Sequence, residues 1–247
     1  MRYLVLTDLH ANLAALDAVL ADAAVQGYDH VLVLGDLVGY GGDPAAVIDR
    51  TLALAPLTIV RGNHDKVCAG LESPLLFNDV AREAAEWTHD TLDAAHLKAI
   101  ADLPQGPVLV PPAIELCHGA PFDEDYYVFD ESDAARALDA AGARLCLFGH
   151  TQVPALFATA DDPFGDETDV AGEFALPTTG PALINVGSVG QPRDRDPRAA
   201  YGILDLDDLN RGTILLRRVS YDIAAAQASI IKAGLPTWLA LRLERGQ

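Results

Sequence analysis

The sequence predicts an α/β protein with two β-sheets covered by helices. In the first third of the chain, short apolar runs alternate with longer segments of helical periodicity, which is the pattern of βαβ units. After residue 150 the pattern changes to short strands separated by turns, as in β-hairpins. The chain has 247 residues, half of them hydrophobic, which suffices for a sizeable core. We therefore expect a single domain over residues 1–247.

Strands and helices follow one another through the first part of the chain. Apolar residues at helical spacing predict a helix over residues 12–25, and Pro44 fits the first turn of a second helix. Residues 73–103 are helical by composition, and Ser132 could cap a later helix that follows an acidic loop. Buried strands are expected at residues 3–7, 30–34, 57–60, 114–117 and 145–148.

The remainder of the chain resembles a set of hairpins. Residues 161–179 are acidic and rich in proline and glycine, which indicates an exposed excursion rather than a linker between domains. Asp222 fits the cap of a last helix, which ends near Gly234 before a short amphipathic tail. The strands expected here span residues 153–159, 182–186, 201–206 and 213–219.

The charge balance and the cysteine content exclude several classes of protein. Aspartate and glutamate number 36 against 17 lysines and arginines, for a net charge of −19. This acidity argues against duplex nucleic acid and anionic membranes as partners, since both need a basic surface. The three cysteines are odd in number and include no Cys-x-x-Cys pair, which makes a disulfide framework unlikely and favours a reducing compartment. No apolar run is long enough to cross a membrane. We expect a cytoplasmic protein, and nothing in the sequence indicates its oligomeric state.

Four of the seven histidines come directly after predicted buried strands. Ligand sites in open α/β sheets lie outside the carboxyl ends of the strands, so these side chains are expected to converge there. A single loop histidine is as readily explained by contact with solvent, but four of them together with nearby acids indicate a site. The four are His10, His64, His118 and His150.

Acidic and amide side chains occur beside these histidines. Asp8 and His10 are two residues apart, so an extended backbone directs both to one face, and Asp36 follows the second strand. Asn63 and Asp65 flank His64. This mixture of nitrogen and oxygen ligands without a thiolate suits Mn²⁺, Fe, Zn²⁺ or Ni²⁺. A shared carboxylate would let two ions lie about 3.5–4 Å apart, the geometry used for phosphoryl chemistry.

The chain contains five short motifs in the order Asp8-Leu-His10, Gly35-Asp36, Gly62-Asn63-His64-Asp65, His118-Gly119 and Gly149-His150-Thr151-Gln152. Together they resemble the motifs of the calcineurin-like metallophosphoesterase superfamily. Residues 185–194 are further similar to its compact bacterial and archaeal phosphodiesterase branch. The resemblance implies a four-layer α/β/β/α sandwich of two mixed sheets flanked by helices, with metals on the loops at one edge.

The resemblance also implies two divalent metal ions, with Mn²⁺ the first candidate. Asp36 would bridge the ions, and Asp8 with His10 would complete one site. A hydroxide between the two ions would attack phosphorus in line. The ligands of the other ion would be Asn63, His118 and His150.

Residues beside the metal ligands are given catalytic or binding roles by the same resemblance. His64 would lie near the leaving oxygen as general acid, with Asp65 orienting it, although Asp65 is equally suited to cap a helix or turn. Arg193 is expected to reach a substrate phosphate, because arginine binds phosphate oxygens in bidentate fashion. Pairing with a neighbouring aspartate is the alternative. Asn12 could contact phosphate or cap the following helix.

The chain departs from the family pattern at two places. Where the family usually has a second histidine after His150, this chain has Gln152, whose amide oxygen can ligate more weakly than imidazole. Alternatively, Gln152 points away and caps the loop. The acid–arginine pair of the protein-phosphatase branch is replaced by Gly39 and Tyr40, which argues against a phosphoprotein phosphatase.

The first hypothesis is therefore a metal-dependent phosphodiesterase that acts on a small or flexible phosphate ester. A phosphomonoesterase, a nucleotidase and a dinucleoside-polyphosphate hydrolase are the alternatives among enzymes. A hypothesis of another class is a weakly catalytic or non-catalytic metal-binding scaffold, which Gln152 suggests.

Overall fold

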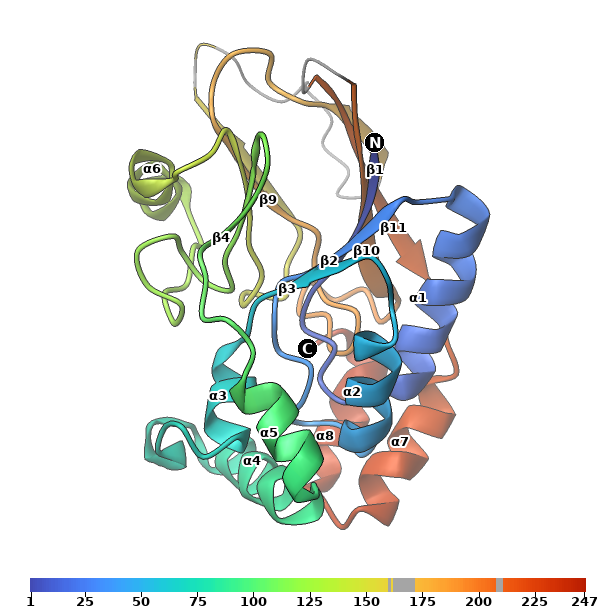
Figure 1. Cartoon of the computed structure of the whole chain (residues 1–247). Coiled ribbons are helices and arrows are strands. Elements are labelled where there is room, and N and C mark those ends of the chain that lie inside the picture. The colour runs from blue at the N-terminus through green and yellow to red at the C-terminus, as the bar shows by residue number, and fades with distance from the viewer. Residues whose placement is uncertain (160, 162–171, 208–210) are drawn as a thin grey trace.

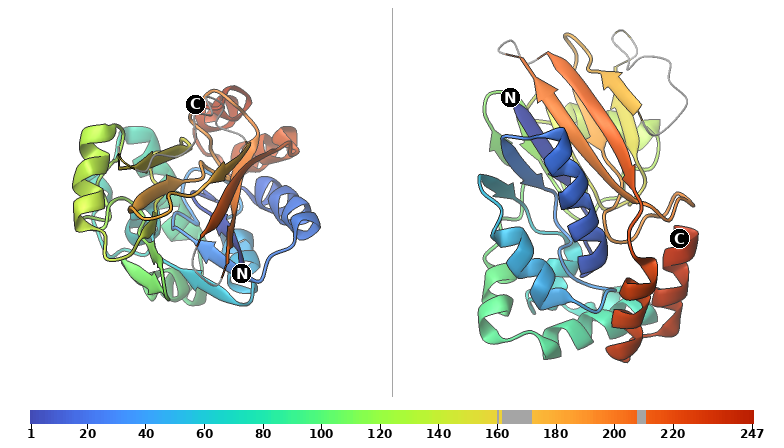
Figure 2. Two further views of the ribbon diagram at one scale, coloured as in Figure 1. Left: turned by 90° about the horizontal axis from the view of Figure 1, so that it is seen from above. Right: turned by 90° about the vertical axis from the view of Figure 1, so that its right-hand side faces the viewer.

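The computed structural model describes residues 1–159, 161, 172–207 and 211–247. Two mixed sheets make up the centre of the molecule, and helices flank them (Figures 1 and 2). This confirms the predicted fold class. Most of the excursion expected over residues 161–179 lies outside the described residues.

The first sheet has the strand order β3-β2-β1-β10-β11-β8. The strands β1, β2 and β3 run parallel, whereas β10, β11 and β8 pair antiparallel with their neighbours. The parallel part is built from the βαβ units that the sequence predicts. The bounds are β1 Arg2–Leu6, β2 His30–Val33, β3 Leu57–Ile59, β8 Gly172–Ala175, β10 Ala199–Leu206 and β11 Gly212–Val219.

The second sheet has the strand order β4-β5-β6-β9-β7. Its central strands β5, β6 and β9 are parallel, and both edge strands are antiparallel. The bounds are β4 Val108–Val110, β5 Ile114–Leu116, β6 Leu145–Leu147, β7 Ala155–Ala158 and β9 Ala182–Asn185.

The alternation of side chains along β1 shows how the layers are stacked. Tyr3 and Val5 belong to the apolar cluster between the two sheets, while Leu4 and Leu6 belong to the cluster beneath the outer helices. The helices α1 (Leu13–Gln26) and α2 (Pro44–Leu52) pack against the outer face of the first sheet. On the far side, α6 (Glu131–Ala140) packs against the second sheet (Figure 1). The molecule thus has four layers.

The remaining helices gather at one end of the sheets (Figure 1). Among the described residues, no helix has both the length and the hydropathy needed to cross a bilayer. The bounds are α3 Asn63–Cys68, α4 Asp79–Thr91, α5 Ala94–Ala101, α7 Ile223–Lys232 and α8 Thr237–Leu241, with 3₁₀ turns η1 Pro74–Leu76 and η2 Arg242–Arg245.

The structure corrects three local expectations. The cap of α6 is Asp130, whose carboxylate accepts the backbone N–H groups of Ser132 and Asp133, so Ser132 is not the cap. Residues 172–175, expected in an exposed excursion, form strand β8 on the edge of β11. The strand β4 and the helix α3 were not predicted; both are short.

Candidate metal centre

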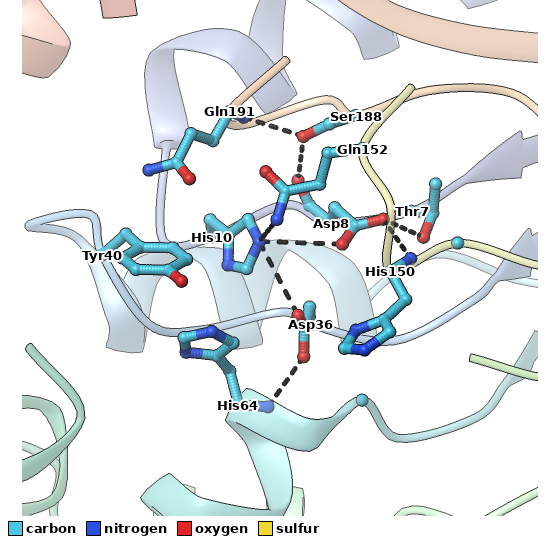
Figure 3. Close-up of polar contacts among 12 residues, drawn as sticks. Thr7, Asp8, His10, Asp36, Tyr40, His64, His150, Gln152, Ser188 and Gln191 are labelled. Atoms are coloured by element: carbon cyan, nitrogen blue, oxygen red, sulfur yellow. Dashed lines mark hydrogen bonds and ion pairs between the residues drawn. The ribbon is translucent and has the colours of Figure 1, made fainter. Parts of the chain in front are cut away.

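The seven predicted metal ligands come together at the edge where the parallel strands end. Asp8 and His10 follow β1, and Asp36 follows β2. Asn63 begins α3 after β3, while the two remaining histidines follow strands of the second sheet. Figure 3 shows most of these side chains directed at one another. The full set is Asp8, His10, Asp36, Asn63, His118, His150 and Gln152.

Asp36 stands at the centre of this set. Its Oδ2 atom lies 3.6 Å from His10 Nε2 and 3.4 Å from His118 Nε2. Its other oxygen, Oδ1, accepts the backbone N–H of His64 at 2.9 Å. One carboxylate oxygen is thus held by the chain, and the other faces the imidazoles of His10 and His118. Figure 3 shows the contacts of Asp36 with His10 and with the backbone of His64.

Backbone carbonyl groups fix the orientation of three histidine rings. His10 Nδ1 donates to Val38 O at 3.1 Å, and His118 Nδ1 donates to Leu34 O at 2.7 Å. His150 Nε2 donates to Asp125 O at 3.2 Å. In metal sites such outer hydrogen bonds set the tautomer and leave the second nitrogen free to ligate. The nitrogens left free are His10 Nε2, His118 Nε2 and His150 Nδ1.

These free nitrogens define two groups of donor atoms that share Asp36. In one group, His118 Nε2 lies 3.2 Å from Asn63 Oδ1 and 3.1 Å from His150 Nδ1. In the other, His10 Nε2 lies 3.7 Å from Asp8 Oδ1. The His64 ring also has a nitrogen within 4.8 Å of donor atoms of His10 and Asp36.

Gln152 points into the second of these groups. Its amide Nε2 lies 2.9 Å from His10 Nε2 (Figure 3). Gln152 Oε1 and Asp8 Oδ1 are buried, and neither has a hydrogen-bond partner in the described part of the chain. Because the two ends of an amide are exchanged by a half-turn, Gln152 can present either atom to His10. Two buried oxygens without a donor fit a site for a cation.

Five of the candidate ligands have a left-handed backbone. The φ angles are 53° at Asp8, 46° at His10, 55° at Asp36, 68° at His150 and 61° at Gln152. For residues with a Cβ atom this conformation is uncommon and costs about 1–3 kcal/mol each when strained. Such a concentration is typical of functional sites, because the surrounding structure must hold the backbone there.

Burial and charge act together on the central groups. Burial acts to raise the pKa of Asp36, but neighbouring His118, followed by His64, outweighs it and holds that pKa well below its usual range. Burial acts to lower the pKa of His118, but Asp36 outweighs it and raises the pKa to about 10. Burial lowers the pKa of His150 to about 3. Asp36 therefore favours the charged form of His118, and a cation bound to both groups would compete with that proton.

His64 lies against the second donor group, next to His10 and between aromatic rings. Its ring centroid is 5.1 Å from that of His10, 4.4 Å from Tyr40 and 4.6 Å from Phe77. Burial lowers the pKa of His64 to about 3. A Cβ atom at Gly39, where φ is +85°, would lie 2.4 Å from His64 Nδ1. Glycine at this position therefore makes room for the ring.

The structure gives Asp65 and Asn12 capping roles. Asp65 accepts the backbone N–H groups of Gly62, Leu37 and Val38, at 2.9, 2.8 and 3.2 Å, and so ties α3 to the loop that carries Asp36. Asn12 Oδ1 accepts the N–H of Ala15 at the start of α1, and its Nδ2 donates to Gly190 O. Both polar atoms of Asn12 are thus used by the fold.

Arg193 contacts Tyr40, which in turn contacts the candidate ligand His10. Its guanidinium carbon is 5.8 Å from the centroid of the Tyr40 ring, which itself lies 4.8 Å from the His10 ring. Arg193 Nη2 is 3.4 Å from the Tyr40 hydroxyl and from Gln191 Oε1. Its Nε is buried without a hydrogen-bond partner among the described residues. A second arginine, Arg242 of η2, lies at the same 5.8 Å from Tyr40.

The sequence reasoning missed several residues that support the ligands. Thr7 Oγ1 donates to Asp8 Oδ2 at 2.6 Å, and Ser188 Oγ donates to Asp8 O at 2.8 Å (Figure 3). Their signal was position: Thr7 precedes a candidate ligand, and Ser188 lies in the motif of residues 185–194. Arg242 had no local signal, because the fold of the C-terminal segment brings it to Tyr40.

A buried cluster of imidazole, carboxylate and amide groups at the edge of two mixed sheets defines a candidate metal centre in an α/β fold. Comparison with known proteins agrees with this class. The family model for the calcineurin-like phosphoesterase superfamily domain matches residues 1–209. The chain therefore belongs to the calcineurin-like phosphoesterase superfamily, a family of metal-dependent phosphoric ester hydrolases.

Individual relatives match over nearly the whole chain. An uncharacterized protein of Methanocaldococcus jannaschii is 34% identical, and the match covers 98% of this chain and 97% of the relative. The crystal structure of a metallophosphoesterase from Sphaerobacter thermophilus is similar with a TM-score of 0.82 and 37% identity, over 100% and 99% of the two chains. A hypothetical protein of Pyrococcus horikoshii has the same fold, with a TM-score of 0.81 and 20% identity over 100% and 98%.

Proposed function

We propose that this protein is a phosphodiesterase that uses two divalent metal ions, Mn²⁺ first among them, to hydrolyse a small or flexible phosphate ester. The observation that carries the proposal is the place of Asp36 Oδ2, within 3.6 Å of imidazole nitrogens from both groups of donors. A carboxylate so placed suits a shared ligand of two ions. Ions bound here would stabilise the phosphoryl oxygens and supply a nucleophile from water at neutral pH.

Different residues around this centre would bind the metal ions, bind the phosphate and donate a proton. Asp8, His10 and Gln152 would hold one ion, and Asn63, His118 and His150 the other, with Asp36 common to both. The unpartnered Nε of Arg193 supports a role in binding a non-bridging phosphate oxygen. When the bond between phosphorus and the leaving oxygen breaks, His64 would give a proton to that oxygen. This role requires the bound phosphate anion to raise the pKa of His64 above its value of about 3 in the protein alone.

The proposal also covers the extent of the domain and the cellular compartment of the protein. Residues 1–247 would act as one domain, because strands of both sheets contribute ligands to a single centre. The net charge of −19 and three free cysteines support a cytoplasmic location without duplex nucleic acid as a partner.

Replacement of Asp36 tests the proposal. We expect the wild-type protein to bind two ions. Asp36→Asn keeps the shape of the side chain but removes the charge that both ions would share, so turnover of a phosphodiester by this variant should fall below about one thousandth of the wild-type value. Bound Mn²⁺ is counted by equilibrium dialysis, and turnover is measured with bis(p-nitrophenyl) phosphate. Asp49→Asn, on the exposed side of α2, is the matched control.

Two results would contradict the proposal. Wild-type turnover in Asp36→Asn would exclude a shared carboxylate. Metal binding by the wild-type protein without turnover of any monoester or diester would favour the metal-binding scaffold instead.

A further inference from the structure

A cavity of about 210 Å³ opens directly on the candidate metal centre. Two of its lining residues, Asn63 and His150, are candidate metal ligands. A group in this cavity would therefore lie next to a phosphate bound at the centre. The volume is below the roughly 300–1,000 Å³ of pockets for drug-sized ligands. It therefore suits one ring system rather than a whole dinucleotide.

Aromatic rings form the walls of this cavity where it meets the centre. The Tyr127 ring stacks on His150 with centroids 3.7 Å apart and an angle of 26°. Phe77 lies against His64 at 4.6 Å. Both aromatic residues line the cavity, together with Val67 and Leu76. Because His150 and Phe129 stack on the two faces of the Tyr127 ring, a planar group between Tyr127 and Phe77 would meet the exposed edge of the tyrosine ring. It would then lie next to the reacting phosphate, because Tyr127 and Phe77 both contact histidines of the site.

Several apolar side chains at this cavity are exposed in an otherwise acidic protein. Tyr127 is 39% exposed, Leu76 is 83% exposed, and Phe129, which stacks on Tyr127, is 68% exposed. Aromatic side chains that remain open to water beside a polar centre are typical of surfaces that stack with a ligand ring. The apolar lining thus favours an organic group over water.

The charges at the rim disfavour a second phosphate. Glu72 and Asp125 line the cavity, and the buried Lys66 ammonium lies 2.5 Å from the first and 2.6 Å from the second. Lys66 is also 3.2 Å from Glu124, so its three N–H groups all face carboxylates. Arg61 also pairs with Glu124 at 2.9 Å, so two cations face three carboxylates and leave one excess negative charge at the rim. That charge disfavours the next phosphate of a polyphosphate chain.

We propose that the cavity between Tyr127 and Phe77 binds the organic group of the substrate, and that this group is a neutral planar ring such as an aryl group or a nucleobase. This substrate class rests on the phosphodiesterase function proposed above. The substrate would then be a phosphate ester that carries one ring, with a single phosphate at the metal centre.

The test compares two phosphonates that differ only in the group meant for the cavity. Phenylphosphonate and methylphosphonate are measured as inhibitors of bis(p-nitrophenyl) phosphate turnover and as ligands in calorimetry, with excess Mn²⁺. Contacts with the two aromatic rings contribute about 0.5–1.5 kcal/mol each, so phenylphosphonate should bind about tenfold more tightly. This comparison needs no variant.

Variants then assign the preference to the cavity. Tyr127→Leu should reduce the ratio of the two dissociation constants to about threefold or less, while Tyr127→Phe should retain it because the ring remains. Leu76→Ser, at an exposed lining position, should reduce the ratio without opening the core. The matched control is Phe122→Leu, in the same loop but outside this cavity, which should leave the ratio unchanged.

The outcomes separate this inference from the proposed function. A ratio near one, with turnover intact, would overturn the ring site and leave the phosphodiesterase standing. Equal losses in Tyr127→Leu and Phe122→Leu would overturn it as well. Absence of turnover together with absence of binding by either phosphonate would overturn both proposals.

Discussion

At the residue scale, Gln152 occupies a position where the family usually has histidine. Its side chain nevertheless points at the candidate metal centre. Its amide lies 2.9 Å from His10 Nε2, and its Oε1 is buried without a partner among the described residues. The alternative in which Gln152 points away and caps the loop therefore does not describe this structure. This placement fits a role of Gln152 as a weak metal ligand, and the affinity of the ion that it would bind can be measured.

Gln152→His adds an imidazole at that position. Since imidazole binds divalent transition ions more strongly than an amide oxygen, we expect the more weakly held Mn²⁺ to bind at least about tenfold more tightly. Turnover should also saturate at a lower metal concentration. Calorimetric titration measures the affinity, with Gln26→His at the end of α1 as control. An unchanged titration would show that Gln152 is not a ligand.

His64 permits a second test at this scale. If His64 gives its proton to the leaving oxygen, His64→Ala should keep both ions and slow turnover roughly 10²–10⁴-fold. The loss should be smaller for esters with acidic leaving groups, because these need little protonation. The measurement is kcat across a series of substituted phenyl esters. An equal loss for good and poor leaving groups would contradict the role of His64 as the acid.

At the element scale, Asp65 joins the N-terminus of α3 to the loop that follows β2. Removing a buried carboxylate that accepts three backbone N–H groups leaves those donors unpaired, so Asp65→Ala should lower the free energy of unfolding by about 2 kcal/mol. Urea unfolding in EDTA measures this without metal. A variant with full stability but reduced kcat would instead support the orienting role, and exposed Asp79→Ala on α4 is the control.

A second contact joins α1 to the first sheet. Asp22 of α1 accepts from Arg217 of β11 at 2.7 and 3.0 Å and from the hydroxyl of Tyr201 in β10 at 2.6 Å. The hydrogen bonds from Arg217 hold the pKa of Asp22 below its usual range. A lowered folded-state pKa contributes stability above the unfolded-state pKa, and this contribution is lost as the pH falls through the folded-state value.

The pH dependence of Asp22→Asn follows from that sign. Near neutral pH the variant should be less stable than the wild-type protein by about 1 kcal/mol, since the pair is partly exposed to solvent. The difference should shrink below about pH 4, where the wild-type carboxylate becomes protonated. Urea unfolding from pH 7 to pH 3 measures it, with Asp17→Asn on the same helix as control. A difference that grows towards acid pH would contradict the assignment.

Sequence periodicity predicted those elements whose pattern is local. The helix α1 has an apolar stripe and an Asn12 cap, and β1 is a continuous apolar run. By contrast, α3 has only six residues, too few for a periodic stripe, and β8 is a strand because it pairs with the edge of β11. The approach of Arg242 to Tyr40 depends in the same way on tertiary packing.

At the scale of the whole molecule, topology explains why the candidate site was predictable. Parallel strands in each sheet end at one edge, so side chains that follow them converge although they are far apart in sequence. The cavity beside the site was not predictable in this way. Its walls come from η1, α3 and the loop before α6, whose mutual placement follows from packing rather than from any local pattern.

The net charge of the molecule opposes the approach of its proposed substrate. The chain carries −19, and two divalent ions would change this to −19 + 4 = −15, so an anionic ester is repelled at long range. The Debye length falls from about 30 Å at 0.01 M salt to about 8 Å at 0.15 M, which screens that repulsion. We therefore expect kcat/KM for a monoanionic diester to rise about two- to fivefold over this range.

The same measurement on a second substrate identifies the cause. A dianionic monoester should show a steeper rise, because the repulsion scales with the charge of the ligand, while kcat at saturation should change little for either ester. Steady-state kinetics at constant free Mn²⁺, with NaCl as the variable, give both slopes. If kcat/KM falls with salt instead, the local field of the metal ions and of Arg193 governs the approach, and the acidic surface does not.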